Sequence, residues 1–252
     1  MSIWKDKARA GSIHLGLSAM VAAMAAALVF GLWFPYPYRD ISGGRELFGL
    51  VTVVDIAMGP LLTLVVYNRN KSWREKILDF SLIGSLQLAA LCYGLWSVAQ
   101  ARPVHLVFSY DRFNVVTAAD ITPETLAYAP ESLQKLPWLG PTMISLRPLV
   151  GNETFEVTLA ELDGLPAAAR PELWQSYEMG RVTVRRVARP AAELMQRFAP
   201  QSDEIARVLQ STGRAVDALA YVPMKARKNQ FWTVIIDRQS ADVLAFLPLD
   251  SF

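Results

Sequence analysis

The stretch that decides the fold is IHLGLSAMVAAMAAALVFGLWF, residues 13–34 of a chain of 252 residues. It carries no Lys, Arg, Asp or Glu, and its one titratable group is His14. At 1.5 Å per helical residue the run extends about 33 Å, which is enough to cross the apolar core of a bilayer. A cleaved signal peptide is the alternative, but this run is longer than a signal sequence needs, and similar runs follow it. We therefore predict a transmembrane helix over residues 13–34.

Two more apolar runs follow, over residues 46–67 and 77–98. The whole chain is 52% hydrophobic and 19% charged, whereas a soluble domain carries about 25% charge. The apolar excess lies in the first hundred residues, and the remainder has the composition of a soluble domain. The sequence thus predicts a region of three transmembrane helices, residues 1–101, followed by a soluble domain, residues 102–252.

The positive charges of the short segments predict the orientation in the membrane. The N-terminal tail and the second connection hold seven Lys and Arg between them, and the first connection holds two. Because cytoplasmic segments are enriched in Lys and Arg, we expect a cytoplasmic N-terminus and a soluble domain on the far side of the membrane. The first connection forms an outer-mouth loop, and its candidate functional residues are Tyr36, Tyr38, Arg39, Arg45 and Glu46.

The soluble domain is predicted to be α+β with antiparallel strands, because strands and helices mix without strict alternation. Expected strands cover Val104–Tyr110, Phe113–Thr117, Thr142–Leu146, Arg181–Val187, Ala218–Val222, Phe231–Ile236 and Val243–Leu247. Expected helices cover Pro123–Ala127, Glu131–Leu136, 154–163, 166–178, Ala191–Phe198 and Asp203–Thr212.

Asp55 is the most informative single residue, because it lies in the middle of the second apolar run. A carboxylate in mid-bilayer costs at least about 2.5–3.5 kcal/mol on insertion scales, so it needs a polar partner or a function. If the three spans start at common membrane faces, Asp55 and Gln87 lie about 18 and 15 Å from the cytoplasmic face, and His14 lies within about 2 Å of it. We therefore expect Asp55 to face Gln87 inside a three-helix bundle. The pair can hold the helices together, bind a partner or translocate an ion.

Two further features of the apolar runs are candidates for function. Gly59 and Pro60 follow Asp55 by one turn, and Pro60 removes a backbone donor, so a helix kink is expected there. In the first run, small residues recur every four positions and form a ridge that allows close helix approach. This ridge can pack on the protein's own spans or serve as a docking face for a foreign membrane helix. Its residues are Ala19, Ala23, Ala27 and Gly31.

Signatures of catalysis are missing from the sequence. It has no GxSxG, HExxH, P-loop or GxGxxG motif. The single cysteine, Cys92, and the two histidines match no metal-ligand spacing. The soluble part is not basic enough to favour nucleic-acid binding. We therefore expect no catalytic residues, no metal, no cofactor and no nucleic-acid partner.

Several stretches of the sequence are distinctive. The first is FPYPYRDISGGRELF, residues 34–48, and the others are Val54-Asp55 with Gly59-Pro60-Leu61-Leu62-Thr63-Leu64, Gln100–Val104, Asp111–Phe113 and Ala119–Ile121. Together these stretches resemble the TfpX/TfpZ family of type IV pilin accessory proteins, whose soluble domain is periplasmic. The likeness is dense over residues 10–125 and diffuse beyond. It implies a non-enzymatic protein of the Gram-negative inner membrane that assists assembly of a cognate pilin into pili used for twitching.

We therefore predict an accessory protein that binds the membrane helix of a pilin near the small-residue ridge and Asp55, and contacts the pilin head through the soluble domain. Its expected partners are the pilin, the inner-membrane pilus assembly machinery and the lipid bilayer. Two alternatives stay open at this point. One is an enzyme that modifies pilin or glycan, which a deep polar pocket in residues 102–252 would favour. The other is a sensor or small transporter, which a water-filled path to Asp55 would favour.

Overall fold

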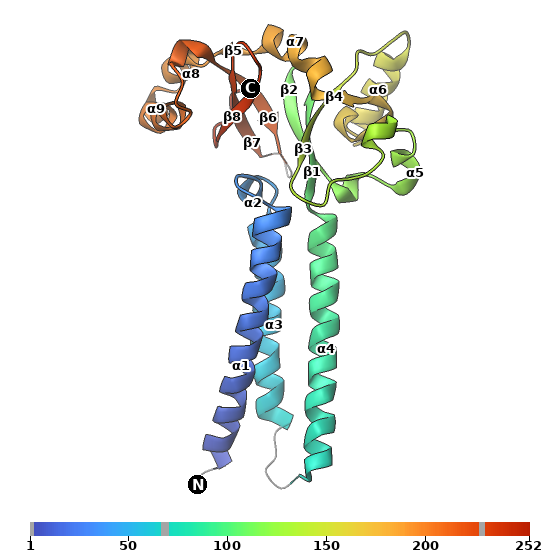
Figure 1. Ribbon diagram of the computed structural model, residues 1–252, viewed down its shortest axis with the longest axis vertical. Helices are drawn as coiled ribbons and strands as arrows, with labels where there is room; N and C mark the ends of the chain where they lie inside the picture. The colour runs from blue at the N-terminus through green and yellow to red at the C-terminus, as the bar shows by residue number, and fades with distance from the viewer. Residues whose placement is uncertain (1–2, 67–70, 227–229) are drawn as a thin grey trace. The chain divides into compact units, whose positions relative to one another are not determined.

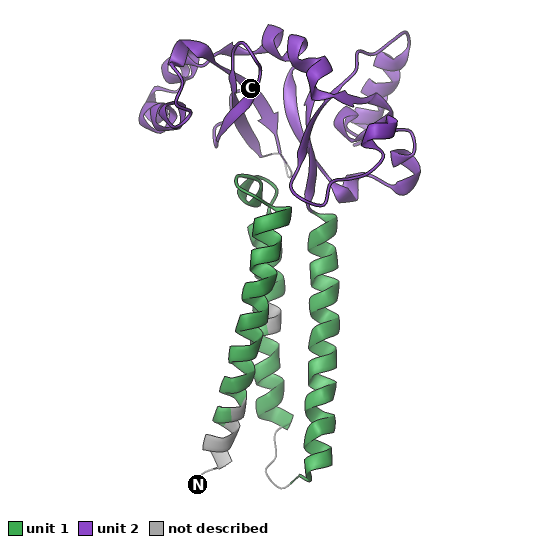
Figure 2. Ribbon diagram, viewed as in Figure 1, with its two compact units in different colours: residues 1–101 green, residues 102–252 purple. Residues whose placement is uncertain are grey.

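The computed structural model describes residues 3–66, 71–226 and 230–252, and the side chains of residues 3–7, 10, 54 and 55 lie outside this description. The described chain forms two compact units, residues 1–101 and 102–252 (Figure 2).

The first unit consists of three long helices and a short connecting helix (Figure 1). Their bounds are Ile3–Leu28 for α1, which continues as a π-helix over Val29–Trp33 (η1), Tyr38–Ile41 for α2, Gly44–Val66 for α3 and Trp73–Gln100 for α4. Three segments are long and apolar enough to cross a membrane: Gly11–Trp33, Gly44–Val66 and Trp73–Gln100. The predicted end of the second span at Tyr67 lies outside the described residues.

Local signals in the sequence set the helix ends. Ser72 caps α4 in a capping box, because its side chain accepts from the Glu75 N–H while the Glu75 carboxylate accepts from the Ser72 N–H. Gly43 connects α2 to α3 with φ +70, a conformation that favours glycine. Pro60 lies inside α3, which runs through it as one helix. The helix therefore continues through Gly59-Pro60, where a kink is predicted from the sequence.

Helix α3 packs against both α1 and α4 and runs antiparallel to them. Close to the start of α1, a Cβ on Gly11 would lie 3.4 Å from Leu64 of α3. At the other end, Phe30 and Phe48 meet edge to face at 5.2 Å between ring centres. On α4, a Cβ on Gly94 would lie 2.5 Å from a methyl of Val51, so only glycine allows this approach. The side chains around these contacts form a buried apolar cluster that includes Ala25, Val29, Phe34 and Val98.

The second unit is built on one mixed sheet in the order β4-β3-β1-β2-β6-β7-β8, with β5 paired to β6. The strand bounds are Pro103–Ser109, Arg112–Thr117, Thr142–Leu146, Trp174–Ser176, Arg189–Pro190, Leu219–Lys225, Phe231–Asp237 and Val243–Leu247 for β1 to β8. The α-helices are α5 Pro123–Leu126, α6 Glu153–Leu162, α7 Tyr177–Val187, α8 Ala192–Arg197 and α9 Ser202–Ser211. Short 3-10 turns cover Ala118–Asp120, Glu131–Leu133, Ala167–Ala169, Pro171–Leu173, Ala199–Gln201 and Val216–Ala218.

The expectation of purely antiparallel strands is wrong. β1 pairs with β3 in parallel, with His105 beside Thr142, and β2 pairs with β6 in parallel, with Phe113 beside Met224. The remaining pairings are antiparallel. The mixed order arises because the chain leaves the β1–β2 hairpin, passes through α5 and returns to the outer side of β1, which a hairpin pattern alone does not reveal.

Two expected elements have the wrong type. Residues 181–187 alternate like a strand, but they lie in helix α7, whose buried residues Tyr177, Gly180 and Val184 follow helical spacing. Residues 166–178 do not form a helix. Pro166 and Pro171 border two short 3-10 turns there, and β4 follows them.

Helix α7 contacts the strands β1, β3 and β4 and also the turn between β7 and β8, and Figure 1 shows it in orange above the sheet. On β3, the side chain of Ser145 lies against Gly180, where a Cβ would come within 2.5 Å of it. On the β7–β8 turn, the Tyr177 hydroxyl donates to the Ala241 carbonyl at 2.7 Å, and Arg181 pairs with Asp242 at 2.7 Å.

Candidate functional site

A polar cluster joins the three long helices within their apolar surroundings. The Nδ1 atom of His14 lies 2.6 Å from the Thr63 hydroxyl on α3, and its Nε2 atom lies 2.6 Å from Oε1 of Gln87 on α4. Because the Gln87 oxygen can only accept, Nε2 carries the proton that it receives. Thr63 is fully buried, so the bond with His14 satisfies a hydroxyl that water does not reach, whereas His14 and Gln87 are half-buried.

Gly59 makes this cluster possible. A Cβ at position 59 would lie 2.2 Å from the Gln87 amide nitrogen and 2.8 Å from His14 Nε2. The missing side chain therefore leaves the space in which the imidazole and the amide meet. The sequence predicts a kink at Gly59-Pro60. The contacts around Gly59 show in addition that this glycine leaves room for two polar side chains from the adjacent helices.

The depth estimate that separated His14 from Gln87 is wrong. It assumed that the three helices start and end at common levels, with the cytoplasmic face at Ile13. Instead, α1 begins at Ile3, which adds about 15 Å of helix before Ile13. Gln87 lies fourteen residues after the start of α4 at Trp73, about 21 Å, whereas Gly59 beside it lies seven residues, about 10 Å, before the end of α3. The helices have unequal lengths, and His14 and Gln87 share a level.

The side chain of Asp55 lies outside the described residues. Its expected contact with Gln87 therefore stays a prediction. What the structure adds is that the Gln87 side-chain oxygen already accepts from His14.

A groove of about 560 Å³ runs along the first unit beside this cluster. α1 and α4 form its walls, and α3 contributes its floor. Its surface is almost wholly apolar, with His14 and Gln87 among its few polar side chains. The lining residues are Ile13, His14, Leu17, Ser18, Val21, Ala22 and Ala25 of α1, Phe48, Val51 and Thr52 of α3, and Phe80, Gly84, Gln87, Leu88 and Leu91 of α4.

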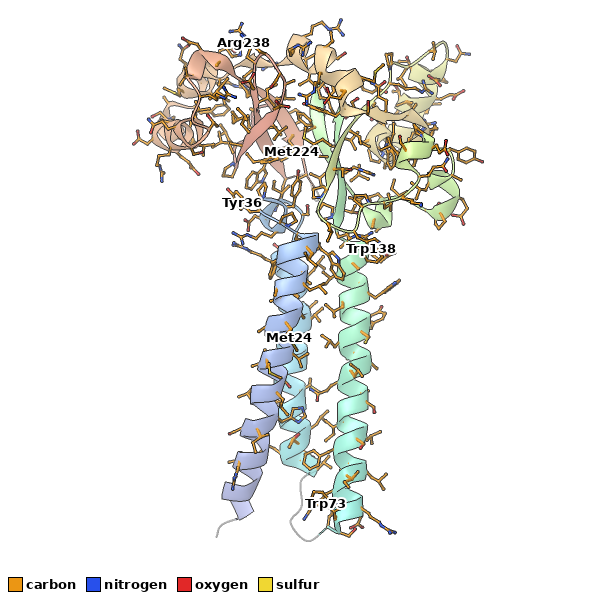
Figure 3. All side chains as sticks on the ribbon, in the orientation of Figure 1. Met24, Tyr36, Trp73, Trp138, Met224 and Arg238 are labelled. Atoms are coloured by element: carbon orange, nitrogen blue, oxygen red, sulfur yellow. The ribbon has the colours of Figure 1, made fainter. Side chains whose placement is uncertain are left out.

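Leu17 and Leu88 on the groove walls are 55% and 62% exposed. A monomeric soluble protein rarely leaves so large an apolar hollow open, so it is suited to lipid or to an apolar partner. Figure 3 shows further apolar side chains projecting from the same helices, among them the labelled Met24 of α1.

The predicted ridge lies on another side of α1. Ala19, Ala23, Ala27 and Gly31 are all exposed, so the ridge does not pack on the protein's own helices. Since Ala23 is about 200° around the helix from Val21, the ridge points away from the groove. The alternative that the ridge serves internal packing is therefore wrong, and the internal packing uses Ala25 and Val29 instead.

The outer-mouth loop is organised around an ion pair that was not predicted. The Nε of Arg45, one of the candidate residues of this loop, lies 2.9 Å from the carboxylate of Asp40 in α2. Arg39 approaches the same carboxylate at 3.7 Å, and its guanidinium lies 5.5 Å from the centre of the Tyr36 ring. Gly44 packs against the buried ring of Phe34, where a Cβ would come within 2.6 Å. The loop is therefore compact, with Tyr38 buried and Tyr36 exposed.

In the second unit, His105 of β1 is a buried titratable group. It is 1% exposed, its Nδ1 lies 2.8 Å from the Thr142 hydroxyl, and its ring meets Trp174 edge to face at 4.8 Å. Burial lowers the pKa of His105 to about 4, partly opposed by the contact with Thr142. The side chain is thus a neutral core residue of a strand, as its place in the sequence suggests. Across the described part of the chain, no group of three or more His, Cys, Asp or Glu could hold a metal ion.

Comparison with known proteins connects this architecture to a family. A family model described as fimbrial assembly protein FimB matches residues 2–43. The chain is similar to the Dichelobacter nodosus fimbrial assembly protein of serogroup I, with 32% identity over 247 residues that cover 97% of this chain and 96% of the relative. The serogroup E1 protein of that organism is 31% identical over the same coverage of both chains.

A shorter relative, the Dichelobacter nodosus fimbrial assembly protein of serogroups C1 and C2, is 42% identical over 122 residues, 48% of this chain and 93% of the relative. No solved structure matches the chain. The similarity to the first two relatives includes both units, the groove and the outer-mouth loop. The chain therefore belongs to the fimbrial assembly protein family to which the FimB model refers.

Proposed function

We propose that this protein assists the assembly of type IV fimbriae as a membrane-embedded, non-catalytic accessory protein. The observation that carries the proposal is full-length similarity to relatives named fimbrial assembly proteins, which supports a role in pilus assembly. The closer assignment to TfpX/TfpZ accessory proteins is part of the proposal and rests on the sequence resemblance.

The proposed location is the bacterial inner membrane. Three helices of the first unit have the length and composition of membrane spans. The excess of Lys and Arg in the N-terminal tail and the second connection favours a cytoplasmic N-terminus, which puts residues 102–252 in the periplasm after three crossings. A reporter fused after Phe252 tests this arrangement: periplasmic activity supports it, and cytoplasmic activity contradicts it.

The proposed mechanism is temporary binding of the pilin's membrane helix in the groove between α1 and α4. Without a hydrophobic driving force inside a bilayer, helices associate through close packing and a few polar contacts. The groove supplies both, because it combines apolar walls with a small residue, Gly84, and the amide of Gln87. The periplasmic unit would contact the pilin head at the same time.

A matched pair of glycine substitutions tests which face of the helices binds. Gly84 lines the groove, Gly31 lies on the ridge, and a Cβ at either position meets nothing within 4 Å. Gly84→Leu therefore places a side chain in the groove, and Gly31→Leu enlarges the ridge, and the added Cβ clashes with nothing in either case. We expect Gly84→Leu to reduce both the pilin recovered with the protein and the fimbriae on the cell surface, and Gly31→Leu to leave both unchanged.

The controls distinguish the proposed docking of the pilin helix from the proposed role in fimbrial assembly. Each variant is expressed in a fimbriate strain that lacks the chromosomal copy, and its membrane level is measured by immunoblot. If Gly31→Leu alone impairs recovery of pilin, the ridge is the docking face. If neither variant has an effect, intramembrane docking is wrong. If the deletion strain keeps its normal fimbriae, the assembly role itself is wrong.

A further inference from the structure

In the second unit, one loop presents large apolar side chains to the outside. In the segment 134–141, the side chains of Trp138 and Leu139 are 65% and 69% exposed. This segment connects the Glu131–Leu133 turn with β3, and Figure 3 labels Trp138 on it. Two adjacent, strongly exposed apolar residues of this size are unusual on a surface that meets only water.

The loop is held in shape from within the unit. Leu133 and Leu136 pack against the buried core, and the Gln134 amide donates to the Ala129 carbonyl at 3.0 Å. Gly140 ends the exposed pair with φ +58. The outward direction of Trp138 and Leu139 is therefore set by the packing on either side of them.

The register of the sheet fixes which edge of the unit carries this loop. β1 and β3 are parallel, and His105 near the start of β1 is beside Thr142, the first residue of β3. The segment 134–141 therefore lies at the edge where the chain enters β1. Arg102, the first residue of this unit, confirms this from a side-chain contact, because its guanidinium lies 4.7 Å from the centre of the Trp138 ring.

The covalent chain then connects this edge with the end of the third span. Arg102 follows Ala101, the C-cap residue of α4, whose apolar segment runs to Gln100. If α4 spans the bilayer as proposed above, a side chain in contact with Arg102 is tied by the covalent chain to within a few residues of the end of that span. Trp is enriched at that depth, where its ring lies among the headgroups.

We propose that Trp138 and Leu139 form an interfacial anchor that inserts into the lipid surface beside the end of α4 and ties the second unit to the membrane. The inference rests on the membrane-embedded arrangement proposed above. It does not depend on the groove or on pilin binding.

The test uses the single native cysteine of the chain. Full-length protein labelled at Cys92, an exposed residue of α4, reports on the span itself. In a Cys92→Ala background, Leu139→Cys reports on the anchor, and Phe155→Cys on α6, 67% exposed, is the matched control in the same unit. Each is labelled with an environment-sensitive fluorophore and reconstituted in phosphatidylethanolamine–phosphatidylglycerol vesicles that contain lipid with a nitroxide near the headgroup or near the chain end.

We expect the position-139 label to be blue-shifted and quenched more strongly by the shallow nitroxide than by the deep one, and the position-155 label to stay unquenched. Quenching at Cys92 with no quenching at position 139 would overturn the anchor and leave the spans intact. No quenching at Cys92 would overturn the membrane arrangement, and the anchor with it. Equal quenching at positions 139 and 155 would show adsorption of the whole unit and would also overturn the anchor.

Discussion

The imidazole of His14 donates to the side-chain oxygen of Gln87 at 2.6 Å, so residues 73 positions apart in the chain meet between the first and third long helices. α1 and α4 make few other contacts, because the groove separates them and α3 packs between them. This bond is therefore a specific polar link across the groove walls.

Removing either partner of this link is expected to destabilise the helix bundle. Polar contacts between membrane helices contribute about 0.6 kcal/mol on average and up to about 1.7 kcal/mol. His14→Ala and Gln87→Ala should each lower the unfolding temperature of the full-length protein in detergent, measured by circular dichroism. The double variant should lose less than the sum of the single losses. Strict additivity would show that the two side chains do not interact.

Adding a methyl group at Gly94 is expected to separate α3 from α4. Ala is favoured over Gly in a helix by about 1 kcal/mol, so an unobstructed change stabilises. At Gly94 the new Cβ would lie 2.5 Å from a Val51 methyl, and the steric cost should exceed that gain. Gly16→Ala is the control, because position 16 of α1 is exposed and a Cβ there meets nothing within 4 Å. Thermal unfolding should show a loss for Gly94→Ala and no loss for Gly16→Ala.

The second unit should become less stable in mild acid because of His105. Its pKa of about 4 in the folded state lies below the ordinary value of 6.5. The unfolded chain therefore binds the proton first, and the stability of the unit falls as the pH drops from 6.5 toward 4, by about 3 kcal/mol in total. Urea unfolding of the full-length protein, followed by tryptophan fluorescence across this pH range, measures the slope. His105→Phe should flatten it, and an unchanged slope would assign it to other groups.

The segment before α6 should loosen when Glu153 is replaced. Its carboxylate accepts from both terminal nitrogens of Arg147, at 2.7 and 2.8 Å, and from the Val150 N–H at 2.7 Å. These contacts, Arg147 first, lower the pKa of Glu153 to about 2, so the arrangement present at neutral pH should persist until the pH falls close to that value. In Glu153→Ala, the Val150 amide should exchange its hydrogen faster. Glu156→Ala, one turn of α6 later and exposed, removes the same charge and should not have this effect.

The sequence was sufficient for features that depend on composition or on strong local patterns. Long apolar runs predicted the three membrane-length helices, and short, largely apolar runs predicted the strands Thr142–Leu146 and Val243–Leu247 with their observed bounds. Weaker patterns predicted the wrong secondary structure where tertiary contacts determine it. Residues 181–187 are helical because Gly180 and Val184 pack on the sheet, although Val182, Val184 and Val187 favour a strand in isolation.

The candidate site was predicted only in part for a similar reason. Gln87 and Gly59 were recognised as unusual within apolar runs, but their neighbour His14 was assigned to the membrane face, because a linear depth scale ignores unequal helix lengths. The groove itself had no signal, since its residues are ordinary apolar side chains. The groove forms because α3 packs closely against both neighbours at glycines, Gly11 of α1 and Gly94 of α4. These contacts keep α1 and α4 on opposite sides of α3.

Helix α7 links the two halves of the sheet in the second unit. Only two residue pairs, Phe113 with Met224 and Asn114 with Lys225, join β2 to β6 at the middle of the sheet. Helix α7 crosses this short pairing. It contacts β3 through Gly180 and the β7–β8 turn through Tyr177 and Arg181. We therefore expect the two halves of the sheet to move together, because the α7 contacts bridge the short β2–β6 pairing.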